Sequence, residues 1–127
     1  MAEDCIFCQI VEGKIPSYKV WEDENFLAFF DIHPVFPGHT LVIPKKHFRW
    51  IWEVENYGEY FEKVREVAVL LKEKLNAEWI QVNVMGNDVS HAHVHLIPRY
   101  PKRKMELGDF TEILQKIRQQ DSKISKA

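Results

Sequence analysis

The stretch Ser90-His-Ala-His-Val-His-Leu-Ile-Pro98 alternates three histidines with apolar residues. Side chains two residues apart on an extended strand point to the same face of a sheet. The spacing therefore predicts that His91, His93 and His95 share one face of a strand while the apolar residues between them enter a core. Half of the chain's six histidines lie in this short run, which indicates a functional site.

The residues alone leave three interpretations of this cluster open. A His-x-His pair on a strand can present two ring nitrogens to one zinc ion. Imidazole is also a nucleophile toward phosphorus near neutral pH and leaves again readily, so it can divide a transfer into two easier steps. The third interpretation is an exposed strand face that carries no site.

Composition restricts the class of protein. A chain of 127 residues, 46% of them hydrophobic, is expected to form one domain with a substantial core. A formal net charge of −2 gives no electrostatic case for nucleic acid as a partner. No apolar run reaches the length of a membrane span and the first residues do not resemble a secretion signal, so we expect a cytoplasmic protein without membrane contact.

Periodicity and turn residues predict a series of short elements. The expected strands cover 18–22, 26–32, 39–43, 79–84 and 93–97, and the expected helices cover 5–12, 57–75 and 110–119. The long helix is predicted to begin with a capping box formed by Asn56 and Glu59 and to stop at Asn76. This order of elements predicts an α+β fold with a mostly antiparallel five-stranded sheet.

The pair Cys5 and Cys8 also has three interpretations. It could be half of a zinc site, a redox pair or two small buried residues. Zinc requires four ligands and the chain has no second Cys-x-x-Cys, so histidines would have to complete the set. His47 and His91 are the candidates.

Aromatic residues surround two further candidate positions. Asp31 ends a strand rich in phenylalanine, where a carboxylate could bind ribose hydroxyls beside an apolar base pocket, or simply cap a turn. Four aromatic residues could form a stacking surface for nucleic acid, but without a basic patch a core or dimer contact is favoured; they are Trp50, Trp52, Tyr57 and Tyr60. The roles of His33 and His39 stay open at this level.

Four motifs in order carry a resemblance to a known family. They are Cys5-Ile-Phe-Cys8-Gln-Ile-Val-Glu-Gly-Lys-Ile-Pro16, Phe29-Phe-Asp31-Ile-His-Pro34, Pro37-Gly38-His39-Thr-Leu-Val-Ile-Pro-Lys-Lys-His47 and the triple-histidine stretch. In these motifs the chain resembles the histidine triad (HIT) family, close to its Hint-like bacterial and archaeal branch. The resemblance implies a HIT domain over 1–108, a C-terminal helix and polar tail over 109–127, and a homodimer that pairs through the long central helix and a strand.

The resemblance also implies an activity. It implies hydrolysis or transfer at the α-phosphate of purine nucleotides, and the expected substrates are nucleoside phosphoramidates, aminoacyl-adenylates or dinucleoside polyphosphates. His93 matches the nucleophile that forms a nucleotidyl-histidine, His95 matches the residue that contacts the phosphate, and His39 matches a histidine close to the nucleophile. Two alternatives stay open, namely a nucleotide-binding or partner-binding HIT module with little turnover, and a metal-dependent hydrolase with zinc on the triad.

The remaining positions that match the family are binding residues. Asp31 matches the acid that binds ribose. The positions that match the apolar base pocket are Ile6, Phe7, Ile10, Phe29, Ile32 and Leu41. The positions that match the segment before the triad are Asn83, Asn87, Asp88 and Val89. The positions that match a structural zinc site are Cys5, Cys8, His47 and His91.

One segment departs from the family pattern. Asn87 stands where glutamine is usual, and Asp88 stands where serine or threonine is usual. A carboxylate beside a phosphate repels it unless the carboxylate is protonated or pairs with a cationic leaving group. The departure therefore predicts weak activity or an unusual leaving group.

Overall fold

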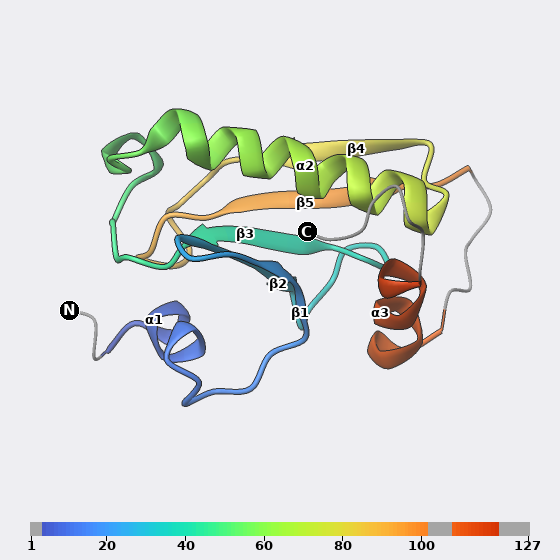
Figure 1. Cartoon of the computed structure of the whole chain (residues 1–127), viewed down its shortest axis with the longest axis horizontal. Coiled ribbons are helices and arrows are strands. Elements are labelled where there is room, and N and C mark those ends of the chain that lie inside the picture. The colour runs from blue at the N-terminus through green and yellow to red at the C-terminus, as the bar shows by residue number, and fades with distance from the viewer. Residues whose placement is uncertain (1–3, 102–107, 120–127) are drawn as a thin grey trace.

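The computed structural model describes residues 4–101 and 108–119, which form an antiparallel sheet with helices on its faces (Figure 1). The sheet has the order β1-β2-β3-β5-β4. Its strands are β1 (Lys19–Glu22), β2 (Phe26–Phe30), β3 (Thr40–Pro44), β4 (Trp79–Asn83) and β5 (Val94–Arg99). The helices are α1 (Ile6–Val11), the 3-10 helix η2 (Ile51–Glu53), α2 (Tyr57–Leu75) and α3 (Phe110–Arg118). The predicted α+β fold is confirmed, with several element ends shifted by one or two residues.

The two faces of the sheet carry separate apolar clusters, because alternate side chains of a strand point in opposite directions. Phe26, Ala28 and Phe30 of β2 pack into the cluster that α2 covers. Leu27 and Phe29 of the same strand pack into the cluster that α1 covers. Figure 1 shows α2 and α1 on opposite sides of the sheet. The chain thus buries a thick core under α2 and keeps a smaller one under α1.

Two contacts fix α2 and the turn before β3. The hydroxyl of Tyr60 in α2 donates a hydrogen bond of 2.6 Å to the carbonyl of Val42 in β3. Gly38 has a φ of +90°, and a Cβ atom there would lie 2.4 Å from Cδ1 of Leu75. Only glycine fits such a close approach at positive φ. This turn delivers His39 to the start of β3.

One of the two local predictions for α2 is wrong. Asn56 makes no cap hydrogen bond to the α2 backbone, and its amide instead donates to Glu59 at 3.4 Å, so the predicted capping box is absent. Asn76 does end α2, in the left-handed conformation. No sequence pattern indicated η2, or the capping box that Asp109 forms at the start of α3.

The tryptophan pair is not a core element. Trp50 and Trp52 stack at 5.0 Å with an interplanar angle of 5°, and Trp52 is 68% exposed. The guanidinium of Arg49 lies 3.6 Å above the Trp50 ring. The core interpretation of this pair is therefore wrong, because the rings stack on one another at the surface.

Two expectations concern other parts of the chain. The polar tail of the predicted C-terminal segment falls on 120–127, outside the described residues. Among the helices that the structure describes, none has the length and apolarity needed to cross a membrane.

Candidate functional site

The three triad histidines lie on the α1 side of the sheet, as their spacing predicts. Ala92, Val94 and Leu96 enter the core under α2. Only His95 belongs to β5, while His91 and His93 lie in the extended run before it. The relative exposure of the three histidines is between 0% and 8%, so the interpretation as an exposed face is wrong.

His91 joins the two cysteines in a buried cluster. Its Nδ1 lies 3.3 Å from Sγ of Cys5 and 3.5 Å from Sγ of Cys8. Nδ1 of His47 lies 3.2 Å from the same Cys8 sulfur. The four donor atoms lie within 4.8 Å of one another, so the sequence-predicted metal ligands come together from α1, the segment after β3 and the segment before β5.

The donor geometry of this cluster fits zinc. Tetrahedral zinc with its usual bond lengths separates sulfur and nitrogen ligands by about 3.5 Å. The Nε2 of His91 lies 2.8 Å from the carbonyl of Pro44, and a ring N–H donated to that carbonyl leaves Nδ1 as a lone pair aimed at the sulfurs. Burial lowers the pKa of His91 to about 4, which keeps the ring neutral as a ligand must be.

The cysteine thiols need a cation to ionise. Burial and the neighbouring Cys5 raise the pKa of the Cys8 thiol to about 12. A bound zinc ion deprotonates a coordinating thiol and removes this penalty. The buried Cys5, Cys8, His47 and His91 set therefore has the chemistry of a closed, four-ligand metal site.

His93 is oriented differently from His91. Its Nδ1 lies 2.7 Å from the carbonyl of His91 and donates its proton there. Nε2 then carries the lone pair, and this buried atom has no hydrogen-bond partner among the described residues. The ring of Phe7 packs edge-on against the imidazole at 5.3 Å. The arrangement holds a nucleophilic nitrogen in a fixed direction.

A chain of hydrogen bonds sets the tautomers of the other two histidines. The N–H of Val35 donates to Nδ1 of His39 at 3.1 Å, so a neutral His39 carries its proton on Nε2. That Nε2 lies 3.0 Å from Nδ1 of His95 and donates to it. His95 must then carry its own proton on Nε2. Burial lowers the pKa of both rings, which favours these neutral forms.

The structure thus assigns different chemistry to the two outward nitrogens. His93 presents a lone pair and His95 presents an N–H donor. The three triad rings do not converge on one point, because His91 groups with the cysteines and the other two group with Asp88. The geometry does not support the interpretation of a metal held by all three.

One carboxylate, that of Asp88, lies beside this pair of nitrogens, and a second, that of Asp31, lies beside His39. Asp88 places one oxygen 3.2 Å from Nε2 of His93 and the other 4.0 Å from Nε2 of His95. Burial opposes ionisation of Asp88, but hydrogen bonds from the backbone N–H groups of Asp88 and Val89 lower its pKa below the usual range. Asp31 places one oxygen 3.6 Å from Nε2 of His39, and its other oxygen accepts a 2.8 Å hydrogen bond from the backbone N–H of His33.

The predicted base-pocket residues divide into two groups. Phe7, Ile10, Phe29 and Leu41 are buried together in the cluster under α1. Ile6 and Ile32 are 49% and 64% exposed. Of these six residues, Ile6 and Ile32 therefore offer the most apolar surface to a ligand.

The remaining predicted residues lie around the histidines. Asn83 is paired with His95 in the β4–β5 register, so both side chains share one face of the sheet. Val89 packs against the cluster under α1, and Asn87 is exposed. Arg49 donates to the carbonyl of Gly86 at 2.8 Å and anchors the segment that carries Asp88.

The orienting groups that sequence reasoning missed are backbone atoms. They are the carbonyl of Pro44, the carbonyl of His91 and the N–H of Val35. Every residue carries such groups, so no residue type in the sequence marks them.

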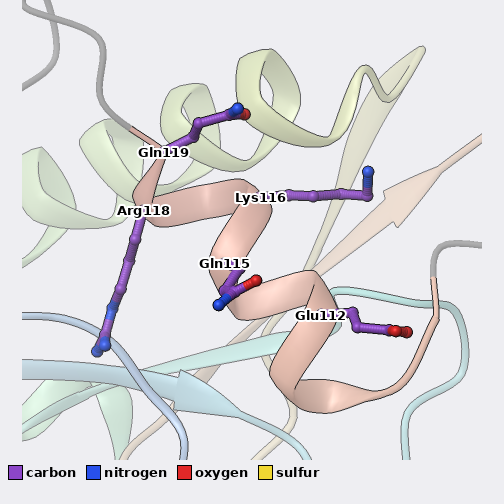
Figure 2. A pocket seen from close by; sticks show the side chains of 5 residues that line it. All are labelled: Glu112, Gln115, Lys116, Arg118 and Gln119. Atoms are coloured by element: carbon purple, nitrogen blue, oxygen red, sulfur yellow. The ribbon is translucent and has the colours of Figure 1, made fainter.

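A hollow elsewhere on the surface lacks these features. A depression of about 680 Å³ along α3 is lined by Glu112, Gln115, Lys116, Arg118 and Gln119. Figure 2 shows four of these side chains projecting from α3 and that of Gln119 directly after the end of the helix. All five are exposed, so this depression offers no buried polar group that could fix a ligand.

Comparison with known proteins places this site in a family. The HIT domain matches residues 12–102 of the chain. Protein hit of Bacillus subtilis is 46% identical over 110 residues, which cover 80% of this chain and 74% of that protein. An adenosine 5'-monophosphoramidase of Schizosaccharomyces pombe, hnt1, is 38% identical over 107 residues, covering 82% and 80%.

A solved structure extends the match to the fold. A zinc-bound histidine triad family protein from Mycobacterium smegmatis superimposes with a TM-score of 0.81 at 31% identity, covering 93% of each chain. The fold and the histidine cluster are those of a histidine triad protein. The chain belongs to the HIT domain family.

Proposed function

We propose that this protein catalyses hydrolysis or nucleotidyl transfer at the α-phosphate of purine nucleotides. The reaction would pass through a nucleotidyl-histidine intermediate on His93. The observation that carries the proposal is the hydrogen bond from Nδ1 of His93 to the carbonyl of His91, which leaves a buried lone pair on Nε2. The relative named as an adenosine 5'-monophosphoramidase supports this reaction class. Nucleoside phosphoramidates, aminoacyl-adenylates and dinucleoside polyphosphates are the candidate substrates.

Each residue has a step in the proposed reaction. Nε2 of His93 attacks the α-phosphorus, a phosphorus–nitrogen bond forms, and the leaving group departs with its bonding electron pair. The Nε2–H of His95 donates to a phosphoryl oxygen and stabilises its developing charge. Water then cleaves the nucleotidyl-histidine and releases the nucleotide. His39 acts as a positioning residue because it holds the tautomer of His95.

The nucleoside would lie on the same side of the sheet. Asp31 would accept hydrogen bonds from the ribose hydroxyls, and Ile6 and Ile32 would contact the base through their exposed surfaces. Asn83, Asn87 and Val89 would contribute to the phosphate side through the segment that leads to the triad. Base stacking on aliphatic surface is sequence-tolerant, so the purine preference is an expectation of the family resemblance alone.

Cys5, Cys8, His47 and His91 would hold a structural zinc ion. When bound, the ion supplies cross-linking between α1 and the segment before β5, with no open coordination position for chemistry. The match to a zinc-bound family member supports this role.

We also propose that two copies of the chain pair through β4 and α2. β4 is an edge strand, and Trp79, Val82 and Val84 on or beside it are 43–51% exposed. Tyr57 and Val69 of α2 are similarly exposed. Large exposed apolar groups on neighbouring elements suit a protein interface. A cytoplasmic location likewise stays a prediction.

The test is hydrolysis of adenosine 5'-phosphoramidate and diadenosine tetraphosphate, followed by chromatography, with His93→Ala in parallel. We expect AMP release by the wild type and a loss of about 10⁴-fold or more in the variant, because a nucleophile has no substitute. Thermal unfolding and zinc content serve as controls that the variant is folded. Equal rates in both proteins would refute the proposed nucleophile, and AMP binding without product would identify a binding module instead.

A further inference from the structure

Among the described residues, Asp88 is the acidic residue whose two carboxylate oxygens lie within 4.0 Å of the outward nitrogens of His93 and His95. It lies 3.2 Å from Nε2 of His93, which is the distance at which a reacting phosphorus approaches a nucleophile. Its second oxygen lies 4.0 Å from Nε2 of His95. A nucleotide bound for attack by His93 must therefore place its phosphoryl group and leaving group beside this carboxylate.

We propose that Asp88 forms a cation-binding subsite that selects substrates whose leaving group carries a positive charge and rejects polyanionic leaving groups. This inference rests on the proposed function, because it assigns a substrate class to the same site. Among the candidate substrates it favours phosphoramidates of amines that bear a second, protonated amino group, and it disfavours dinucleoside polyphosphates.

The local geometry leaves Asp88 available to a ligand. Nε2 of His93 and Nε2 of His95 have no hydrogen-bond partner among the described residues, so the nearby carboxylate is not locked to either ring by a well-aligned bond. The Asp88 side chain is 44% exposed, whereas those of His93 and His95 are 1% and 10% exposed. A half-exposed carboxylate at the mouth of a buried pair can turn toward the group that leaves.

The surrounding segment holds this charge in place. Gly86 is buried and bonded to Arg49 through its carbonyl, and Val89 packs under α1. Asp88 thus lies between two anchored residues and cannot drift far from the histidines. The hydrogen bonds from backbone N–H groups that lower its pKa also keep it charged at neutral pH.

The sign of the selection follows from Coulomb's law. Every phosphate substrate brings negative charge to this position, so a polyphosphate leaving group adds repulsion and an ammonium group adds attraction. Two unit charges at about 4 Å in a partly hydrated site change an equilibrium constant by about tenfold. In the favoured reaction the P–N bond breaks, its electron pair stays on the leaving nitrogen, and that nitrogen takes a proton from water. The remote ammonium group is unchanged.

The test uses two adenosine 5'-phosphoramidates of equal length, one of ethylenediamine and one of propylamine. We expect the wild type to favour the ethylenediamine compound in kcat/KM and Asp88→Asn to lower that preference by about tenfold. The intrinsic difference between the two leaving amines cancels, because only the ratio is compared between proteins. Asp88→Asn should also raise kcat/KM for diadenosine tetraphosphate by about tenfold. An unchanged ratio in Asp88→Asn would overturn the inference.

Glu24→Gln is the matched control, since it removes the same net charge from an exposed position in the turn between β1 and β2. It should keep the wild-type ratio. If Glu24→Gln lowers the ratio as much as Asp88→Asn does, the effect belongs to the net charge of the protein and the subsite is refuted.

Binding separates this inference from the proposed function. The 2-aminoethyl and propyl esters of AMP have alkoxide leaving groups too poor to depart, so they report affinity alone. The wild type should bind the aminoethyl ester about tenfold more tightly, and Asp88→Asn should bind both equally. If turnover does not depend on His93, the proposed function is refuted. A preference for the aminoethyl ester in binding would still support the subsite in that case. With His93-dependent turnover and no preference in either assay, only the subsite fails.

Discussion

His91 and His93 lie two residues apart, yet they turn opposite ring nitrogens toward their chemistry. Nε2 of His91 is bonded to the carbonyl of Pro44 at 2.8 Å, so Nδ1 faces the cysteine sulfurs. Nδ1 of His93 is bonded to the carbonyl of His91 at 2.7 Å, so Nε2 faces Asp88. A backbone carbonyl therefore decides which nitrogen is free, and with it whether the ring suits a metal ligand or a nucleophile.

The surroundings of the two rings reinforce this division. Around His91 the four donor atoms come from protein alone and lie within 4.8 Å of one another, which closes the set. Beside Nε2 of His93 lies the half-exposed carboxylate of Asp88, which leaves the nitrogen accessible to a ligand. A closed ligand set stabilises a fold, and an open one supports chemistry. Substitutions in the two regions should accordingly have different consequences.

Cys8→Ser should remove the metal and much of the stability. Zinc at a free concentration of about a thousandfold its dissociation constant adds about 4 kcal/mol to the free energy of unfolding. The variant should lose about this amount. Zinc content by mass spectrometry and urea unfolding would measure both effects. His93→Ala should show the reverse pattern, with zinc retained and turnover lost. A Cys8→Ser protein that keeps its full zinc content would refute the assignment of the ligands.

The relay from Val35 through His39 to His95 predicts a smaller effect on turnover. His39→Leu removes the donor that fixes His95 with its proton on Nε2, and kcat should fall about 100-fold. His39→Gln keeps an N–H donor at this position and should recover a substantial part of the loss. KM should change less than kcat in both variants, because the relay acts on the developing phosphoryl charge. Equal losses in the two variants would indicate a packing role for His39 instead.

The sequence predicted the strand that carries the histidines because alternation is a property of residue types. It also predicted the ligand set of Cys5, Cys8, His47 and His91, through the resemblance and the need for four ligands. It could not predict which nitrogen of each ring is free, because the partners are backbone groups without a sequence signature. The prediction of a capping box at Asn56 was wrong because its side chain donates to the Glu59 side chain and makes no hydrogen bond to the helix backbone.

The buried aromatic and aliphatic residues show a second limit. Phe7 and Phe29 matched a base pocket by position, but the structure packs them edge-to-face at 5.5 Å in the cluster under α1. Burial depends on contacts between α1 and the sheet that no local pattern contains. The position of Asp88 could be read as a departure from the family, and only the fold shows that its oxygen lies 3.2 Å from His93.

The smallest expected effect is a pH dependence of the free energy of unfolding. It arises from His39 and His95, which lie on the side of the site around His93. Burial lowers the pKa of His39 and of His95, so at pH 5 the unfolded chain binds protons that the folded chain does not. The free energy of unfolding should therefore fall as pH decreases from 7 to 5, by about 1.4 kcal/mol for each pKa unit of difference. The contribution is fully present above the ordinary histidine pKa of about 6.5 and is lost below it.

His95→Gln isolates this contribution, because it leaves Cys5, Cys8, His47 and His91 in place and the pH dependence of metal binding cancels in the comparison with wild type. Its free energy of unfolding should vary less steeply between pH 5 and 7. His33→Gln, at an exposed position of the neighbouring loop, should keep the wild-type slope. Equal slopes for wild type and His95→Gln would mean that the pH dependence of stability resides in the metal ligands. The surroundings of His93 would then differ from those of His91 in reactivity alone.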